Sequence, residues 1–219
     1  MGRRIYNNLK KAIQYIISIH IPIILTVFIP LALGWIYPNI FSPVHIIFLE
    51  LIMGPTCSII YENEPAEENI LKQKPRAATQ NFFNVKELSL SIIQGIGISA
   101  GTLGAYQFAV SSGYSEDLTR SMVFSCLITA NIFLTLVNRS FFYSVITSLS
   151  YKNKLIPIII GITTLLSATM LYWKPLRIFF EFGEISINQL LLSILIGFLS
   201  VVWIEVYKLY KRKTKFSHL

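Results

Sequence analysis

The sequence predicts an all-α membrane protein, a bundle of six transmembrane helices with both termini in the cytosol. Three observations lead to this prediction. The 219 residues are 53% hydrophobic and only 14% charged, which is far too apolar for an ordinary soluble domain. The apolar residues gather into six runs, each long enough to cross about 30 Å of hydrocarbon at about 1.5 Å per residue. Basic residues are also divided unequally between the two sides of the predicted membrane.

The predicted spans lie at residues 13–36, 43–60, 88–110, 121–137, 155–173 and 187–207. If the N-terminus is cytosolic, the outer segments hold three of the 19 Lys and Arg residues, namely Arg120, Lys174 and Arg177. The other sixteen lie in inner segments, so this orientation obeys the positive-inside rule. The net charge of +8 therefore indicates cytosolic loops, and we expect no nucleic-acid partner.

The first span combines a histidine with two prolines. It is too long for a signal peptide and has no Ala-x-Ala cleavage site, so we expect it to stay in the membrane. Pro22 has no N–H and therefore frees the carbonyl of Ser18, and Pro30 does the same further along the helix. His20 lies two residues before Pro22 and is a ligand, a proton carrier or a hydrogen-bonded packing residue. A tight outer turn over residues 37–42 leads to the second span.

The second span holds Glu50, the one acidic residue that lies deep inside any predicted span. A lone carboxylate there costs about 2.5–3.5 kcal/mol on insertion scales and is by default a functional candidate. The alternative is a structural carboxylate that is hydrogen-bonded to a neighbour. Gly54-Pro55 follows one turn later and predicts a helix break, which exposes carbonyls suited to an ion path. A simple kink that improves packing is the alternative for this break.

We therefore predict a cation pathway around the first two spans. Its residues are Glu50, His20, Ser18, Gly54, Pro55 and Thr56. The pattern leaves the identity of any metal unknown.

The remaining segments predict a supporting membrane unit. The loop 62–87 is acidic at first and then basic. Asn131 and Asn138 in the fourth span are typical of hydrogen bonds between helices. Glu205 lies near the inner end of the last span and should pair with Lys208, three residues on.

Two separated motifs resemble P-type cation-transporting ATPases. The segment GRRIYNNLKKAIQYIIS, residues 2–18, is similar to the stalk that enters their fifth transmembrane helix. The segment ENEPAEENILKQKPR, residues 62–76, resembles the loop after their sixth helix. In calcium-pump-like members that loop reads Glu-Pro-Pro, then an apolar pair, then a basic residue and Pro-Arg. Glu64-Pro65, Ile70-Leu71 and Lys74-Pro75-Arg76 stand in those places.

The resemblance implies that the chain corresponds to helices five to ten of such a pump. It implies a cytosolic stalk at 1–12, a hairpin with the cation site at 13–61 and a cytosolic loop at 62–87. A four-helix membrane support at 88–207 and a basic tail at 208–219 complete the chain. A coupling role toward cytosolic domains falls on loop residues that match the motif, namely Glu64, Pro65, Lys74, Pro75 and Arg76.

The resemblance also places the family's cation-binding positions on this sequence. The fifth helix of calcium-pump-like members offers Asn and, three residues on, Glu, which match His20 and Ile23. The sixth offers Asn, Thr and Asp, which match Glu50, Met53 and Gly54. Several oxygen ligands are thus replaced, whereas calcium takes six to eight oxygens. The transported ion therefore stays open between a proton, calcium and another cation.

The phosphorylated Asp-Lys-Thr-Gly-Thr motif of the family has no counterpart in these 219 residues. We expect no cofactor in this chain, whereas the resemblance implies ATP and Mg for the complete pump. The expected partners are membrane lipid and the missing N-terminal part of a P-type ATPase. The expected location is the plasma (inner) membrane of a bacterium. A non-catalytic membrane protein that binds or regulates a full pump, a decayed pump fragment and a stand-alone secondary transporter are the alternatives.

Overall fold

A computed structural model describes residues 2–55, 59–65, 85–141, 143–149 and 153–216. Every regular element in this part of the chain is a helix. In chain order the helices are α1 (Gly2–Ala32), α2 (Pro43–Pro55), α4 (Val85–Ser111), α5 (Glu116–Val137), α6 (Val145–Leu149), α7 (Leu155–Tyr172), α8 (Lys174–Phe179) and α9 (Ile187–Phe216).

The six predicted spans are confirmed, since six helices are long and apolar enough to cross a membrane. The second of them comprises α2 and the helical residues that follow it, and it ends at Tyr61. Helix α1 begins at Gly2 and stops at Ala32, four residues before the predicted boundary. Gly34 there has a φ of 61°, a left-handed conformation that ends helices and that glycine adopts without strain. The short helices α6 and α8 lie outside the predicted spans.

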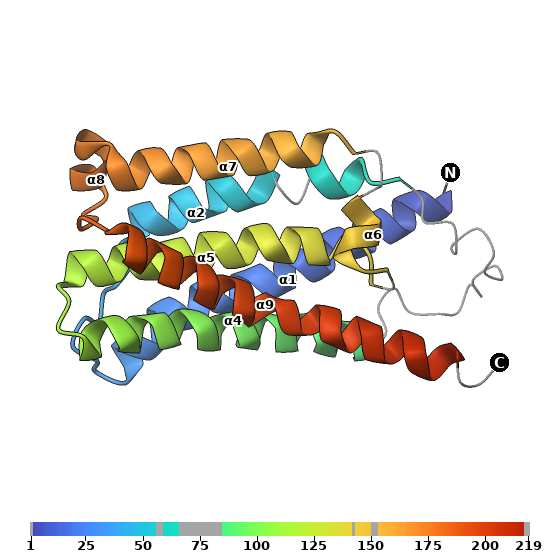
Figure 1. Ribbon diagram of the computed structural model, residues 1–219, viewed down its shortest axis with the longest axis horizontal. Helices are drawn as coiled ribbons and strands as arrows, with labels where there is room; N and C mark the ends of the chain where they lie inside the picture. The colour runs from blue at the N-terminus through green and yellow to red at the C-terminus, as the bar shows by residue number, and fades with distance from the viewer. Residues whose placement is uncertain (1, 56–58, 66–84, 142, 150–152, 217–219) are drawn as a thin grey trace.

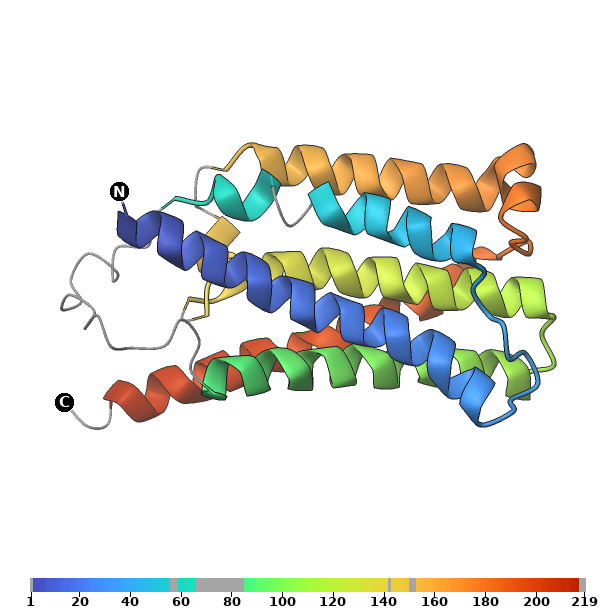
Figure 2. The same ribbon diagram turned by 180° about the vertical axis from the view of Figure 1, so that it is seen from behind.

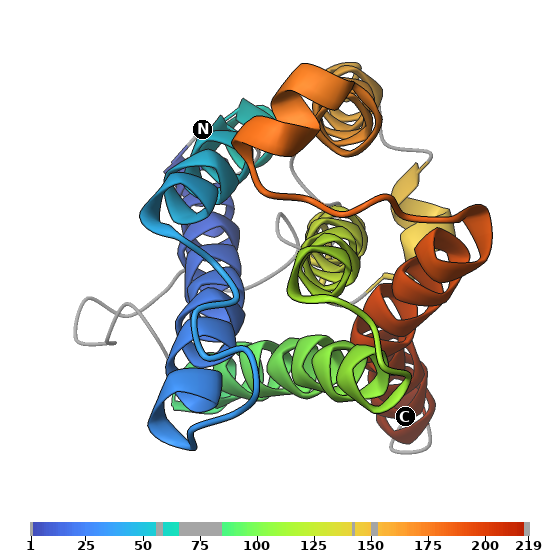
Figure 3. The same cartoon turned by 90° about the vertical axis from the view of Figure 1, so that its left-hand side faces the viewer.

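The long helices run lengthwise through the bundle, with α1 and α9 tilted relative to the others (Figure 1). The N-terminal end of α1 and the C-terminal end of α9 lie at the same end of the bundle. This agrees with the prediction that both termini lie on one side of the membrane, which stays a prediction together with the cytosolic assignment of that side. Helix α1 crosses the bundle obliquely and reaches α4 (Figure 2). Helix α5 is the most buried of the six spans and lies inside a ring of the other helices (Figure 3).

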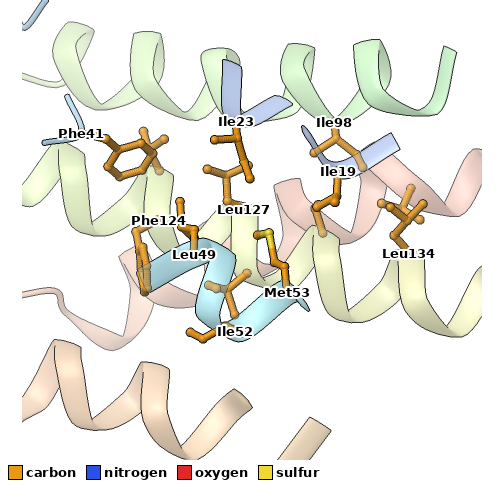
Figure 4. Close-up of a cluster of buried hydrophobic side chains, with 14 of the residues drawn as sticks. Ile19, Ile23, Phe41, Leu49, Ile52, Met53, Ile98, Phe124, Leu127 and Leu134 are labelled. Atoms are coloured by element: carbon orange, nitrogen blue, oxygen red, sulfur yellow. The ribbon is translucent and has the colours of Figure 1, made fainter. Parts of the chain in front are cut away.

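Buried apolar side chains from α1, α2 and α5 meet in the interior of the bundle (Figure 4). Ile19 and Ile23 come from α1, Met53 comes from α2 and Leu127 comes from α5. The outer faces of the helices also carry large apolar side chains, such as Phe28, which is exposed. Exposed apolar surface on a helix of spanning length is what contact with lipid requires, so the fold and the composition agree.

Hydrogen bonds fasten the connections at the end opposite the termini. The buried side chain of Arg120 donates through Nε to the carbonyl of Ile40 at 2.8 Å and through Nη1 to that of Glu181 at 2.7 Å. His45 accepts from the backbone N–H of Ser42 at Nδ1, 3.1 Å away, and its Nε2 lies 2.6 Å from the carbonyl oxygen of Phe180. The turn before α2 and the segment after α8 are therefore held together, and α2 is fixed at its starting end.

Candidate cation site

A cavity of about 310 Å³ lies between α1 and α2, near the point where α2 ends. Helix α1 supplies four of its lining residues and α2 supplies three. They are Tyr15, Ile16, Ile19 and His20 from α1, and Glu50, Met53 and Gly54 from α2. Three of the predicted pathway residues, His20, Glu50 and Gly54, are thus brought to one cavity.

Glu50 and His20 are in direct contact across this cavity. The Nε2 atom of His20 lies 3.1 Å from Oε1 of Glu50, and each side chain is 42% exposed. The other ring nitrogen, Nδ1, lies 2.8 Å from the carbonyl oxygen of Ile16, one turn earlier in α1. The ring is therefore held between its own helix and α2.

The wall of the cavity toward the bundle interior is apolar. Ile19, Ile23 and Met53 are buried in the core cluster. Ile23 and Met53 stand at positions where the resembling pumps carry oxygen ligands, and here they pack against Leu127 and its neighbours instead (Figure 4). Among the described residues, no group of three or more His, Cys, Asp or Glu side chains could hold a metal ion. Among the residues that line the cavity, the ionisable side chains are Glu50, His20 and Tyr15.

The remaining predicted pathway residues are placed differently. Ser18 is fully buried and does not line the cavity. Its hydroxyl donates to Oε1 of Gln94 in α4 at 2.8 Å. Its backbone carbonyl oxygen also faces α4, since a Cβ added to Gly95 would lie 3.0 Å from that oxygen. Gly54 and Pro55 are the last two residues of α2, and residues 56–58 lie outside the described part of the chain, so the break expected there stays a prediction. Thr56 lies outside the described residues.

Glu64, a residue of the predicted coupling loop, is completely buried. Its Oε1 accepts a hydrogen bond from Nε of Arg139 at 2.9 Å, and the arginine side chain is only 2% exposed. Its Oε2 accepts from Nδ2 of Asn153 at 2.9 Å. Its backbone carbonyl accepts from Nδ2 of Asn8 in α1 at 2.8 Å. We call these four residues the Glu64 cluster. It joins α1, the segment after α2, the end of α5 and the residues before α7.

The structure describes only one of the other predicted coupling-loop residues. Pro65 is half-buried next to the Glu64 cluster, and Lys74, Pro75 and Arg76 lie outside the described residues. The sequence gives no direct signal for the partner of Glu64, because Arg139 is 75 positions away and no spacing rule links them. A basic residue directly after an apolar span is normally attributed to the positive-inside rule.

Polar residues in the other spans connect helices, as expected for the two asparagines. Asn131 accepts a hydrogen bond from the hydroxyl of Tyr15, and Asn138 exchanges hydrogen bonds with Gln94 at 3.0 and 3.3 Å. Nζ of Lys208 lies 2.8 Å from Oε1 of Glu205, which confirms the predicted local pair.

Residues 38–210 match the sequence model of a family described as cation transporting ATPase, C-terminus. This chain is also similar to a calcium-transporting ATPase of Bacillus cereus, with 25% identity over 96% of this chain and 25% of the relative. A calcium-transporting ATPase of Listeria monocytogenes is 24% identical over 97% of this chain and 24% of the relative. Calcium-transporting ATPase type 2C member 1 of Mus musculus is 25% identical over 96% of this chain and 23% of its own length. The chain thus spans about a quarter of the length of these relatives.

Proposed function

This chain belongs to the family formed by the C-terminal membrane part of P-type cation-transporting ATPases, and on that premise we propose that Glu50 and His20 form part of a cation pathway. The observation that supports this most directly is the contact of 3.1 Å between the two side chains, inside a cavity at the end of α2. Ionisable side chains at membrane depth are costly and by default mark functional sites.

The placement of the pair agrees with a role in a larger assembly. Both side chains are half-exposed, and the apolar side chains around them, such as Ile24 of α1 and Leu51 of α2, are exposed as well. A partner helix that covers this face would exclude lipid from the pair and complete the walls of the cavity. The N-terminal part of a P-type pump is the partner that we propose, and ATP and Mg would act in that part.

The Glu64 cluster supports a coupling role for the segment after α2. It links the first turns of α1 with the residues that follow the second span, so a displacement of the stalk would be transmitted to the end of α2. Lys74, Pro75 and Arg76 would extend this contact toward the cytosolic domains.

We further propose that the membrane is the plasma membrane of a bacterium, in line with the bacterial relatives.

The test is transport by an assembled pump. The part of the Bacillus cereus relative that precedes the matched segment would be fused to this chain, and ATP-driven cation uptake would be measured in proteoliposomes. We expect Glu50→Gln to lower the uptake rate by about tenfold or more, because the amide keeps the shape and removes the charge. Membrane insertion and yield should stay unchanged.

Glu184→Gln is the matched control, because that carboxylate is 80% exposed and lies far along the chain from the hairpin. It should transport like the unmodified fusion. Unmodified transport by the Glu50→Gln variant would contradict the pathway role. A chain that lowers turnover of a complete pump, and gives no transport in the fusion, would favour the regulatory alternative.

A further inference from the structure

The hydrogen bonds of His20 determine where its protons lie. Nδ1 is 2.8 Å from the carbonyl oxygen of Ile16, and a carbonyl oxygen can only accept. Nδ1 therefore carries a hydrogen and donates it. In a neutral imidazole, Nε2 then carries a lone pair and is an acceptor.

The same Nε2 faces Oε1 of Glu50 at 3.1 Å. An ionised carboxylate is also only an acceptor, so a neutral histidine and an ionised glutamate would present two lone pairs to each other. One proton in the contact removes this conflict. It lies either on Nε2, which makes an imidazolium beside a carboxylate, or on Oε1, which makes a carboxylic acid beside a neutral ring. In both arrangements the pair holds two protons in total and has no net charge.

We propose that the Glu50–His20 contact is a binding site for one proton. This proton is then the cation that is transported at this point of the pathway, a role that rests on the function proposed above. The site binds the proton between Nε2 and Oε1, while the hydrogen on Nδ1 holds the ring in position. Release of the proton to water leaves the pair with one negative charge, and rebinding restores neutrality.

The surroundings of the pair favour a proton over a metal ion. Tyr15 is the other ionisable residue among those that line the cavity, and its hydroxyl is directed to Asn131 of α5. The other lining residues, Ile16, Ile19, Met53 and Gly54, offer no side-chain oxygen. A calcium ion takes six to eight oxygens, and a proton needs two acceptors that face each other. A metal cation at Glu50 would also have to displace the proton that lies between the two side chains.

The test counts protons on the pair directly. The full chain would be placed in lipid nanodiscs, with nitrogen-labelled histidine and carboxyl-labelled glutamate, and studied by NMR. A His218→Gln background leaves His20 and His45 as the two histidines. The measurement is made about one pH unit above 6.5, the ordinary pKa of a free histidine. We expect two protons in total on the pair and a hydrogen on Nδ1 of His20.

Two comparisons make the result specific. In Glu50→Gln, His20 should keep a single proton, on Nδ1, because the amide N–H of glutamine can donate to Nε2. His45 is the internal control, since Nδ1 accepts from Ser42 and Nε2 faces the carbonyl of Phe180, so that its spectrum should be the same in both samples. Added calcium should leave the signals of the pair unchanged.

A single proton on the wild-type pair would overturn the proposal, and so would a change in its signals on addition of calcium. These outcomes are separate from the transport experiment. If the pair holds one proton and Glu50→Gln still abolishes transport in the fusion, the pathway role stands and the proton assignment fails. If the pair holds two protons and Glu50→Gln transports normally, the proton site stands and the pathway role fails.

Discussion

Glu50 and Glu64 lie 14 residues apart in the sequence and occupy opposite environments. Glu50 is half-exposed beside a histidine in an open cavity. Glu64 is fully buried, and both carboxylate oxygens accept hydrogen bonds from the side chains of Arg139 and Asn153. A half-exposed charge can exchange its proton with the surroundings, whereas a buried and fully bonded charge fixes structure. This difference agrees with the transport role proposed for the first residue, and it predicts a structural role for the second.

At the residue scale, we predict that the Glu64 cluster is important for stability. Glu64→Gln should clearly lower the melting temperature of the chain in detergent. Removal of one charge of a buried ion pair costs about 3–5 kcal/mol of folding free energy, because the other charge stays buried without its partner. Arg139→Met should have a similar effect. The melting temperature, followed by fluorescence or by aggregation, is the measurement.

The double variant Glu64→Gln/Arg139→Met provides the control for this prediction. Because it leaves no charge unpaired, its loss of stability should be smaller than the sum of the two single losses. Glu184→Gln, which breaks an exposed pair with Arg177, should change the melting temperature little. Strictly additive losses in the double variant would show that the two residues do not act as a pair.

At the scale of elements, α9 packs against α5 and α4 through small residues. A Cβ added to Gly197 of α9 would lie 2.6 Å from the carbonyl oxygen of Cys126 in α5. A Cβ added to Gly101 of α4 would lie 2.8 Å from Cβ of Ser200. Backbone atoms cannot move aside as a side chain can, so the close approach of α9 to α5 depends on glycine at position 197. Small residues at helix contacts are common in membrane proteins for this reason.

We therefore predict that Gly197→Ala destabilises the bundle, by about 1–3 kcal/mol as for other overpacked sites. Gly104→Ala is the matched control, because a Cβ at that helical position would meet nothing within 4 Å. It should leave stability unchanged or raise it slightly, since alanine favours helix over glycine. The two melting temperatures should be compared under the same detergent conditions. Equal stability of the two variants would mean that α9 can shift without cost.

At the scale of the whole molecule, the connections opposite the termini form one end of the bundle (Figure 1). The hydroxyl of Tyr37 donates a hydrogen bond to the carbonyl oxygen of Tyr114 at 2.9 Å. The backbone N–H of Gly183 donates to the carbonyl oxygen of Asp117, also at 2.9 Å. Three connections that the basic residues place outside are therefore in mutual contact. A topology with one of them on the other side of the membrane would break these bonds.

This arrangement predicts the result of labelling in intact cells. Single cysteines would be introduced after replacement of Cys57 and Cys126 by alanine. Cysteines at Ser42, at Gly113 and in the segment 174–184 should react with a membrane-impermeant reagent from outside. A cysteine at Asn69, which lies outside the described residues, should react only after the membrane is opened. Labelling of Asn69 in intact cells would contradict the cytosolic assignment of both termini.

The sequence by itself determined the features that depend on neighbouring residues. Hydropathy along the chain predicted the six spans, because each span must bury a continuous run of apolar residues in lipid. The position of Glu50 in an apolar run identified it as a candidate site. The two motifs in residues 2–76 pointed to the family that the comparison with known sequences then showed.

Only the tertiary structure decided which side chains meet. Glu50 meets His20, Glu64 meets Arg139, and Ser18 turns to α4 although Pro22 marks its carbonyl as available. These pairings depend on the rotation of each helix about its axis and on the angle at which helices cross. Contacts between distant parts of the chain, such as the close approach at Gly197, set both quantities. A spacing pattern within one segment carries no information about them, because a helix offers every face and packing selects one.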